Sequence, residues 1–406
     1  MSQIAFKFRQ IVQRMWFLPA AFSLLAVLTL LIAFGLARLI PDGLPFTLSS
    51  EAVESILTVL ASSMLTVAVF ALSTIVSALA SASSQTTPRA VPLIVGDRSA
   101  QTSISVFIGA FLFSIVGIIG LSAGIYSEAS RLLLFAVTLG VVVLVVAALI
   151  RWIGQISAIG RVGETVSRAG EAAEKAFRTV PGKGLLGCRE LAGDPSGDPI
   201  FSRKTGYVQH IDIGRLQDHA DENDLLITIT SRPGAYAAPD RPLVLVAGTV
   251  DEALAEKLAG AFTVGSARTF DSDPRFGLIV LAEIAGKAMS PGINDPGTAI
   301  AVIGTLVRVL TERPEEDSEL KYERVLVAPL DPHDLMADAF RPIARDGAGS
   351  IEVILRMIAG LKTLARCRPE LEHAAKGMIK DAVERGTAAM SAKSDKAALK
   401  AAAVME

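Results

Sequence analysis

The sequence has little of the chemistry on which enzymes and secreted proteins depend. Its only cysteines are Cys188 and Cys367, too few for a secreted disulfide framework, and this fits a reducing compartment. The four histidines are far apart and show no metal-binding spacing. The sequence has no Gly-x-Ser-x-Gly elbow, Walker loop or Cys-x-x-Cys motif. We therefore expect no enzymatic activity, no metal site and no cofactor.

Charge is scarce as well, but only in the first part of the chain. Residues 1–155 hold 8 of the 39 Lys and Arg residues and 5 of the 41 Asp and Glu residues. The formal net charge is −2, and no long Lys/Arg run is present, so we expect no nucleic-acid partner. This division predicts a membrane domain followed by an ordinary charged domain.

Four long apolar runs account for the uncharged part, at about residues 17–39, 53–83, 104–126 and 132–151. Each is long enough to cross a bilayer core of about 30 Å, which takes about 20 residues. We predict an α-helical membrane domain of four transmembrane helices over residues 1–152. The third run carries small residues at helical spacing, so it should pack closely on a neighbour. The fourth, rich in Val and Leu, should face lipid.

The basic residues predict how these spans are oriented. Only Arg38 and Arg131 lie on one side, whereas the side of the termini holds Lys7, Arg9, Arg14, Arg89, Arg98 and Arg151. The positive-inside rule then predicts a multi-pass protein of the inner (cytoplasmic) membrane with both termini in the cytoplasm. Trp16 and Trp152, at the cytoplasmic ends of the first and fourth spans, should act as interfacial anchors.

The second span has no ionisable side chain between Glu54 and Arg89, yet hydroxyls recur there every three or four residues. In a helix they form one stripe, interrupted at Phe70. A hydroxyl stripe gains nothing from lipid, so it should face other helices or a water path. The predicted pore-lining set, here called the hydroxyl stripe, comprises Thr58, Ser62, Thr66, Phe70, Ser73, Ser77, Ser81, Ser84, Gln85 and Arg89.

Two hypotheses explain the hydroxyl stripe. In the first, several copies of the chain surround an ion path, with Phe70 as its apolar constriction and Arg89 giving a modest anion preference. Active coupling is disfavoured, because no span carries an ionisable residue in its interior. In the second, the hydroxyls only pack helices within a non-conducting sensory or scaffold protein. We favour a homo-oligomeric channel that its cytoplasmic domain gates or regulates.

The remainder of the chain predicts a cytoplasmic α+β domain. A connector helix is expected over residues 153–181, either as a solvated link or as a lever on the membrane helices. Short strands over residues 200–250 surround a Pro-Gly turn and resemble a biotinyl/lipoyl-type sandwich barrel. A helical part should follow over residues 251–385, and the Ala/Lys-rich residues 386–406 should form a flexible tail.

Two Asp-Pro pairs, Asp273-Pro274 and Asp295-Pro296, predict helices that begin at residues 274 and 296. The loop before the second helix offers polar groups at a helix N-terminus, where they could hold an anion or simply cap the helix. The candidate residues for a small anionic ligand are Arg268, Arg275, Ser290, Asn294 and Asp295.

Three motifs carry a family resemblance: Ser83-Ser84-Gln85-Thr86-Thr87-Pro88-Arg89, Phe107-Ile-Gly-Ala-Phe and Ser290-Pro-Gly-Ile-Asn-Asp-Pro-Gly-Thr298. Together they resemble the domain-of-unknown-function 2254 family of bacterial predicted membrane proteins, over nearly the whole chain. The first motif departs from the family pattern, with Thr86-Thr87 where we expect an aromatic residue and a serine. The resemblance implies the membrane topology and supplies no activity.

The predicted topology can be tested by cysteine labelling in intact cells. Cysteines introduced at Asp97 and directly after Gly182 should be shielded from impermeant thiol reagents, whereas cysteines at Gly43 or Ser127 should react. The reason is the excess of Lys and Arg on the side of the termini. Labelling in the reverse pattern would overturn the assignment of inside and outside.

Overall fold

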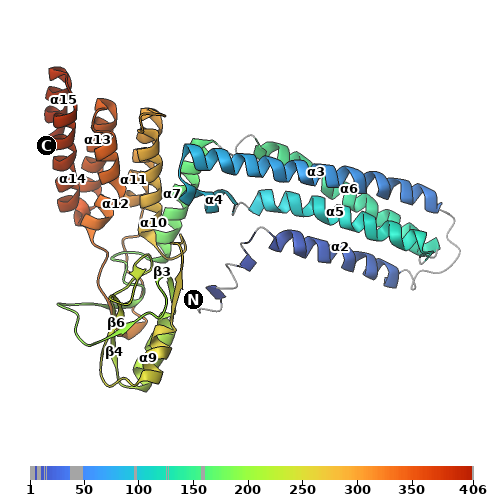
Figure 1. Ribbon diagram of the computed structural model, residues 1–406, viewed down its shortest axis with the longest axis horizontal. Coiled ribbons are helices and arrows are strands. Elements are labelled where there is room, and N and C mark those ends of the chain that lie inside the picture. Colours follow the sequence, from blue (N-terminus) through green and yellow to red (C-terminus); the bar gives the residue numbers. More distant parts are fainter. Residues whose placement is uncertain are drawn as a thin grey trace. The chain divides into compact units, whose positions relative to one another are not determined.

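The computed structural model describes residues 5–6, 11–12, 14, 16–36, 49–95, 98–124, 126, 128–156 and 161–404. The chain forms two compact units (Figure 1). The membrane unit comprises residues 8–82 and 91–161, and the mixed unit comprises residues 1–7, 83–90 and 162–406. The chain therefore passes between the two units four times.

The membrane unit is built from helices α2 (Phe17–Leu36), α3 (Ser50–Gln85), α4 (Val91–Val95), α5 (Arg98–Ser122) and α6 (Glu128–Ile156). The last turn of α3 already belongs to the mixed unit. Of the described helices, α3, α5 and α6 are long and apolar enough to cross a membrane. Helix α2 corresponds to the first predicted span and is apolar over Phe17–Ile32. The four-span topology remains a prediction.

Helix α5 is the most enclosed of these helices. In its most apolar window 61% of the residues are buried, against 33% in α3 and 22% in α6. Gly109 lies against Phe22 of α2, and a Cβ at Gly117 would lie 3.1 Å from the side chain of Leu57. The predicted close packing of the third span is thus confirmed. The sequence also places a Gly-xxx-Gly pair at Gly120 and Gly124, but α5 ends at Ser122 and Gly124 lies in a turn with φ +66°, so the pair does not share a helical face.

Only one of the two tryptophans has the exposure expected of an interfacial anchor. Trp16 is 57% exposed, whereas Trp152 is 3% exposed and belongs to the same hydrophobic cluster as Ala100 and Phe107. Trp152 therefore fills the interior of the helix bundle. A pattern of apolar runs predicts how far along a helix a tryptophan lies, but not which face of the helix carries it.

The mixed unit contains two small sheets. Strands of the five-stranded sheet lie in the order β1-β8-β4-β6-β2, with parallel pairing of β8 to β1 and β4 and antiparallel pairing elsewhere. Their bounds are Cys188–Glu190 (β1), Asp198–Phe201 (β2), Leu226–Ile229 (β4), Pro242–Ala247 (β6) and Tyr322–Val327 (β8). The antiparallel second sheet, β5-β3-β7, comprises Tyr236–Ala237 (β5), Gly206–Ile211 (β3) and Phe262–Gly265 (β7).

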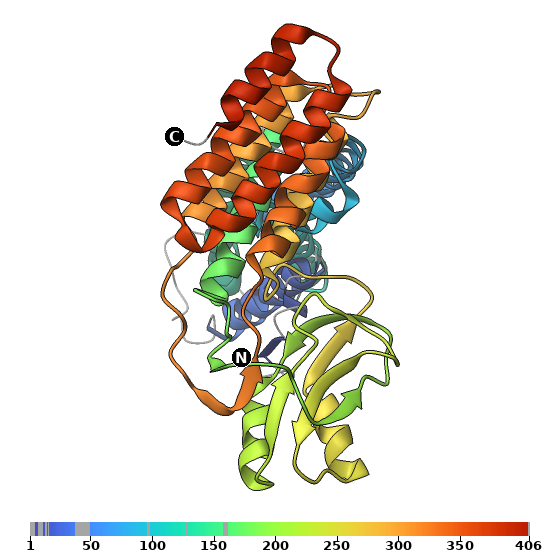
Figure 2. The same cartoon turned by 90° about the vertical axis from the view of Figure 1, so that its left-hand side faces the viewer.

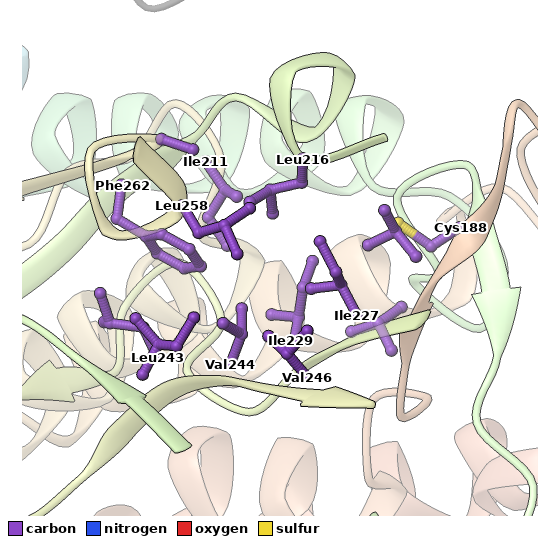
Figure 3. Close-up of a cluster of buried hydrophobic side chains, with 14 of the residues drawn as sticks. Cys188, Ile211, Leu216, Ile227, Ile229, Leu243, Val244, Val246, Leu258 and Phe262 are labelled. Carbon is purple, nitrogen blue, oxygen red and sulfur yellow. The ribbon is translucent and has the colours of Figure 1, made fainter. Parts of the chain in front are cut away.

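One hydrophobic core holds the two sheets together with helices α8 (Ile213–Glu222) and α9 (Glu252–Ala259) (Figure 3). Ile227 and Ile229 of the central strand β4 meet Leu216 of α8 and Leu258 of α9 in this core. Cys188 is buried there as well, and burial raises the pKa of its thiol to about 12. The thiol is therefore protonated at neutral pH and unreactive.

This β part differs from the predicted sandwich barrel over residues 200–250. Strand β8, some 75 residues beyond that range, lies between β1 and β4, and helix α8 separates β3 from β4. The parallel register pairs Thr228 with Leu326 and Ile229 with Val327. Such pairing joins distant segments, so a local strand pattern cannot reveal it.

The helical part of the mixed unit agrees with the sequence more closely. Its helices lie side by side (Figure 2) and comprise α10 (Pro274–Ala288), α11 (Pro296–Thr311), α12 (Pro332–Asp346), α13 (Ile351–Cys367), α14 (Glu372–Ala389) and α15 (Lys393–Ala403). The two predicted N-caps are confirmed, since Asp273 accepts a hydrogen bond from Phe276 N and Asp295 one from Thr298 N. The predicted flexible tail is instead helix α15, which buries Leu399 against α13 and α14.

Helix α7 (Val162–Thr179) lies in the predicted connector and belongs to the mixed unit. It packs on α10 and α11, and its Glu174 forms an ion pair of 2.9 Å with Arg308 of α11. One face of α7 is buried, including Val166, Ala173 and Phe177, so α7 is not a solvated link. The predicted connector begins at residue 153, within α6, and its residues 157–160 lie outside the described residues.

The first residues of the chain also belong to the mixed unit. The Phe6 side chain is fully buried, and its ring stacks on that of His210 in β3, with centroids 4.8 Å apart. The chain therefore packs in the mixed unit both before it enters the membrane unit and after it leaves it.

Two glycines make a matched test of the contact between α7 and α10. A Cβ at Gly277 would lie 2.5 Å from the Cβ of Ala173, whereas a Cβ at Gly304 would meet nothing within 4 Å. Gly277→Ala should destabilise the unit by about 1–3 kcal/mol, the usual range for overpacking. Gly304→Ala should stabilise it by about 0.5–1 kcal/mol through helix propensity. Thermal unfolding midpoints should shift in opposite directions, and equal shifts would contradict the packing described.

Candidate functional site

From Thr58 to Ser77 the hydroxyl stripe lies on the outside of the membrane unit. In the single chain, Thr58, Ser62, Thr66, Ser73 and Ser77 are all exposed. Phe70, which interrupts the stripe, is 64% exposed. The described helices of the membrane unit thus do not cover these hydroxyls, and packing within that unit does not explain them.

The packed face of α3 lies opposite the hydroxyl stripe. At about 100° per residue, the buried set and the stripe are centred about 180° apart around the helix. The buried set is entirely apolar and comprises Val53, Leu57, Leu60, Ala61, Met64, Ala68, Ala71, Ile75 and Ala82. Helix α3 therefore uses one face to join its own bundle and presents the hydroxyls on the other.

Hydroxyls along α3 find acceptors in their own helix. Ser62 donates to the carbonyl of Val59 at 3.1 Å, and Thr66 donates to the carbonyl of Ser62 at 3.0 Å. These two donors are satisfied without a second helix, while the oxygens keep lone pairs that can accept from water or a neighbour. This part of the stripe can thus tolerate lipid but gains from a polar partner.

The segment that follows α3 is attached to the mixed unit by polar contacts. Thr86 and Thr87 are buried, and Thr87 Oγ1 donates a 2.8 Å hydrogen bond to Glu283 of α10. Arg89, in the short 3₁₀ turn η2 (Pro88–Ala90), forms an ion pair with the same carboxylate. Hydrogen bonding to Glu283 raises the pKa of Arg89. Two residues of the first family motif therefore converge on one carboxylate.

The predicted ligand arginines are held in ion pairs. Arg268 binds Asp273 through two hydrogen bonds of 2.7 and 2.9 Å, and Asp273 is 2% exposed. Arg275 binds Asp334 and Asp338, each at 2.6 Å. These carboxylates satisfy the arginines, so the geometry favours a structural role for both. Of the five predicted ligand residues, Ser290 alone lines a pocket formed by the segment after α3 together with α10 and α12. Arg89 lines the same pocket.

The loop before α11 is organised as a helix cap. Asp295 accepts from Thr298 N at 3.0 Å and from Thr298 Oγ1 at 2.6 Å, and these hydrogen bonds lower the pKa of Asp295. The backbone N–H groups of Asn294 and Asp295 donate to the carbonyls of Ser290 and Ala288. The Asp295 carboxylate thus takes the place at the helix N-terminus where an external anion would bind.

The sequence did not predict three of the residues that line the same pocket as Arg89, namely Glu283, Lys287 and Arg341. Glu283 lies 194 residues from Arg89, and no local pattern connects them. The spacing of Glu283, Gly286 and Lys287 places them on one face of α10, and Ser290 follows directly after the end of that helix. That spacing is the only signal that could have indicated a common polar wall.

Comparison with known proteins identifies the family but no activity. The family model described as "Predicted membrane protein (DUF2254)" matches residues 12–363. Uncharacterized protein MT1328 of Mycobacterium tuberculosis and uncharacterized protein Mb1321c of Mycobacterium bovis are each 27% identical over 128 residues. The match covers 30% of this chain and 25% of each relative, so the chain spans about a quarter of their length. No solved structure matches the chain significantly.

The capping role of Asp295 predicts a specific pattern of stability. Asp295→Ala should lower the free energy of unfolding by about 0.5–2 kcal/mol, and Asp295→Ser should largely restore it. Because the folded protein lowers the pKa of Asp295, the carboxylate's contribution is complete above its ordinary pKa of about 3.9 and is lost as the pH falls through the lowered value. Denaturation curves of the three proteins across pH would show this. Unchanged stability of Asp295→Ala would contradict the role.

Proposed function

Because the chain belongs to the DUF2254 family of predicted membrane proteins, we propose that several copies of it form an ion pore in the inner membrane, lined by α3. The observation that carries the proposal is the exposed hydroxyl stripe opposite the packed face of α3. Both termini and the mixed unit lie in the cytoplasm in this proposal, which assigns the protein no enzymatic activity.

A second copy is the occupant that best fits the stripe. Lipid tails offer hydroxyls no hydrogen bonds, whereas a symmetric ring brings the same stripe from each copy to one axis. Helix α3 supplies a long enough wall, since 36 residues span about 54 Å at about 1.5 Å per residue. Lone pairs of the stripe hydroxyls would then line a water-filled path.

Two residues set the expected behaviour of the pore. Phe70 is the large apolar side chain within the stripe and would form a constriction that closes by dewetting. Arg89, at the end of the stripe, is paired with Glu283, so its positive field is partly cancelled. We therefore propose at most a weak preference for anions. The contact with Glu283 is also the route by which the mixed unit would regulate α3.

The rival proposal makes α3 an assembly helix in a non-conducting scaffold. In this proposal the same exposed stripes meet at the axis of the oligomer, but their hydroxyls pack against one another and leave no water-filled path. Both proposals require oligomers, so conductance and not oligomeric state separates them.

The pore can be tested with purified full-length protein in planar bilayers, with light scattering as a check on the oligomer. Phe70→Ala should raise the open probability, because it removes the apolar constriction. Ser62→Leu and Ser73→Leu should reduce the single-channel current while the oligomer persists. The matched control is Leu72→Phe, which enlarges an exposed side chain about 120° around the helix from the centre of the stripe and should leave the current unchanged. Folded oligomers that pass no current under varied voltage, tension and pH would replace the pore with the scaffold.

A further inference from the structure

A pocket of about 830 Å³ lies within the mixed unit, beside the segment that follows α3. One wall is formed by the motif residues Ser83 and Thr86–Arg89, and the others come from α10 and α12. The volume falls in the range of ordinary small-molecule sites, about 300–1,000 Å³. Neither proposed role of α3 accounts for this pocket.

Small residues keep the pocket open. Ala282 and Gly286 of α10 and Ala337 of α12 line it. A Cβ at Gly286 would lie 2.9 Å from a carboxylate oxygen of Asp346, so glycine is what lets the two helices bring this side chain close. Charged residues of α10 and α12 line the pocket beside these small residues.

The charges of the pocket do not balance. Its three carboxylates already have cationic partners: Glu283 pairs with Arg89, Asp338 with Arg275 and Asp346 with Arg345. Lys287 and Arg341 also line the pocket and both are exposed. Among the described residues, neither lies within ion-pair distance of a carboxylate. Two cations therefore point to a missing anion.

We propose that this pocket binds a phosphate-bearing anion through Lys287 and Arg341. A guanidinium binds phosphate through paired N–H donors and an ammonium adds a point charge, so the two side chains suit the doubly charged oxygens of a phosphate group. The pocket exceeds the size of one phosphate and leaves room for the organic part of the ligand. The same chemistry is offered by an anionic lipid headgroup and by a soluble phosphate compound.

Arg89 gives this site a link to α3. The ligand competes with Glu283 for Arg89, whose side chain is 60% exposed and therefore accessible. Partial transfer of Arg89 to the ligand weakens the contact that holds the segment after α3 on α10. Binding should thus change the attachment of α3 whether or not α3 lines a pore.

The experiment uses full-length protein and two probes. Isothermal titration with pyrophosphate in neutral detergent tests a soluble phosphate source. Native mass spectrometry from phosphatidylcholine nanodiscs, with and without phosphatidylglycerol, tests a lipid source. Each is repeated with Lys287→Gln, Arg341→Gln and the control Arg356→Gln, which removes an exposed arginine of α13 that does not line the pocket. All variants keep their neighbours' ion pairs and should fold.

At least one probe should bind, and both pocket variants should weaken that binding by about tenfold, the usual effect of losing one charged hydrogen bond. The control should bind as the unmodified protein does. Pyrophosphate binding identifies a soluble ligand, and retention of phosphatidylglycerol alone identifies a lipid. Binding of neither probe, or equal losses in the pocket variants and Arg356→Gln, would overturn the proposal. None of these readouts requires conductance, so the result is independent of the pore test.

Discussion

Hydrocarbon supplies no hydrogen bonds, so polar groups within a bilayer must find partners in the protein. Helices α3, α5 and α6 meet this requirement for their backbones by being helical. The hydroxyls of Ser62 and Thr66 meet it by donating to carbonyls of the preceding turn. This local satisfaction is what allows α3 to direct a polar face away from its own bundle. The neighbour on that face can be water, lipid or another copy of the chain. Which of these it is determines the function of α3.

The parts of the fold that sequence reasoning predicted well are those with local causes. Asp273 and Asp295 cap their helices because the side chain, the following proline and the backbone N–H all lie within a few residues. The sheet order was not predictable in this way. Strand β8 joins β1 and β4 in parallel, and parallel pairing requires long connections whose partners no local pattern specifies. The Ala/Lys-rich end of the chain was predicted as a flexible tail from composition, yet it contains helix α15, which buries Leu399.

The candidate site shows the same division. Periodicity alone predicted that the hydroxyls of α3 share a face, and the structure adds that this face is opposite the packed one. Two roles were predicted for the loop at Asp295, helix capping and anion binding, and in the structure the carboxylate caps the helix and fills the position that an anion would take. The pair of Arg89 and Glu283 had no sequence signal, because ion pairs between distant segments leave none. Lys287 and Arg341 could not be predicted as unpaired cations, because the carboxylates near them are paired with arginines only in the folded structure.

The repeated passage of the chain between its two units has a consequence for biosynthesis. Phe6 and the segment of residues 83–90 belong to the mixed unit, yet both are translated before most of that unit exists. Glu283 follows Arg89 by 194 residues, a delay of roughly 10–40 s at about 5–20 residues per second. During that interval Thr86 and Thr87 are without the wall that buries them. The mixed unit therefore cannot be completed until α10 has been synthesised, long after the segment of residues 83–90 that it binds.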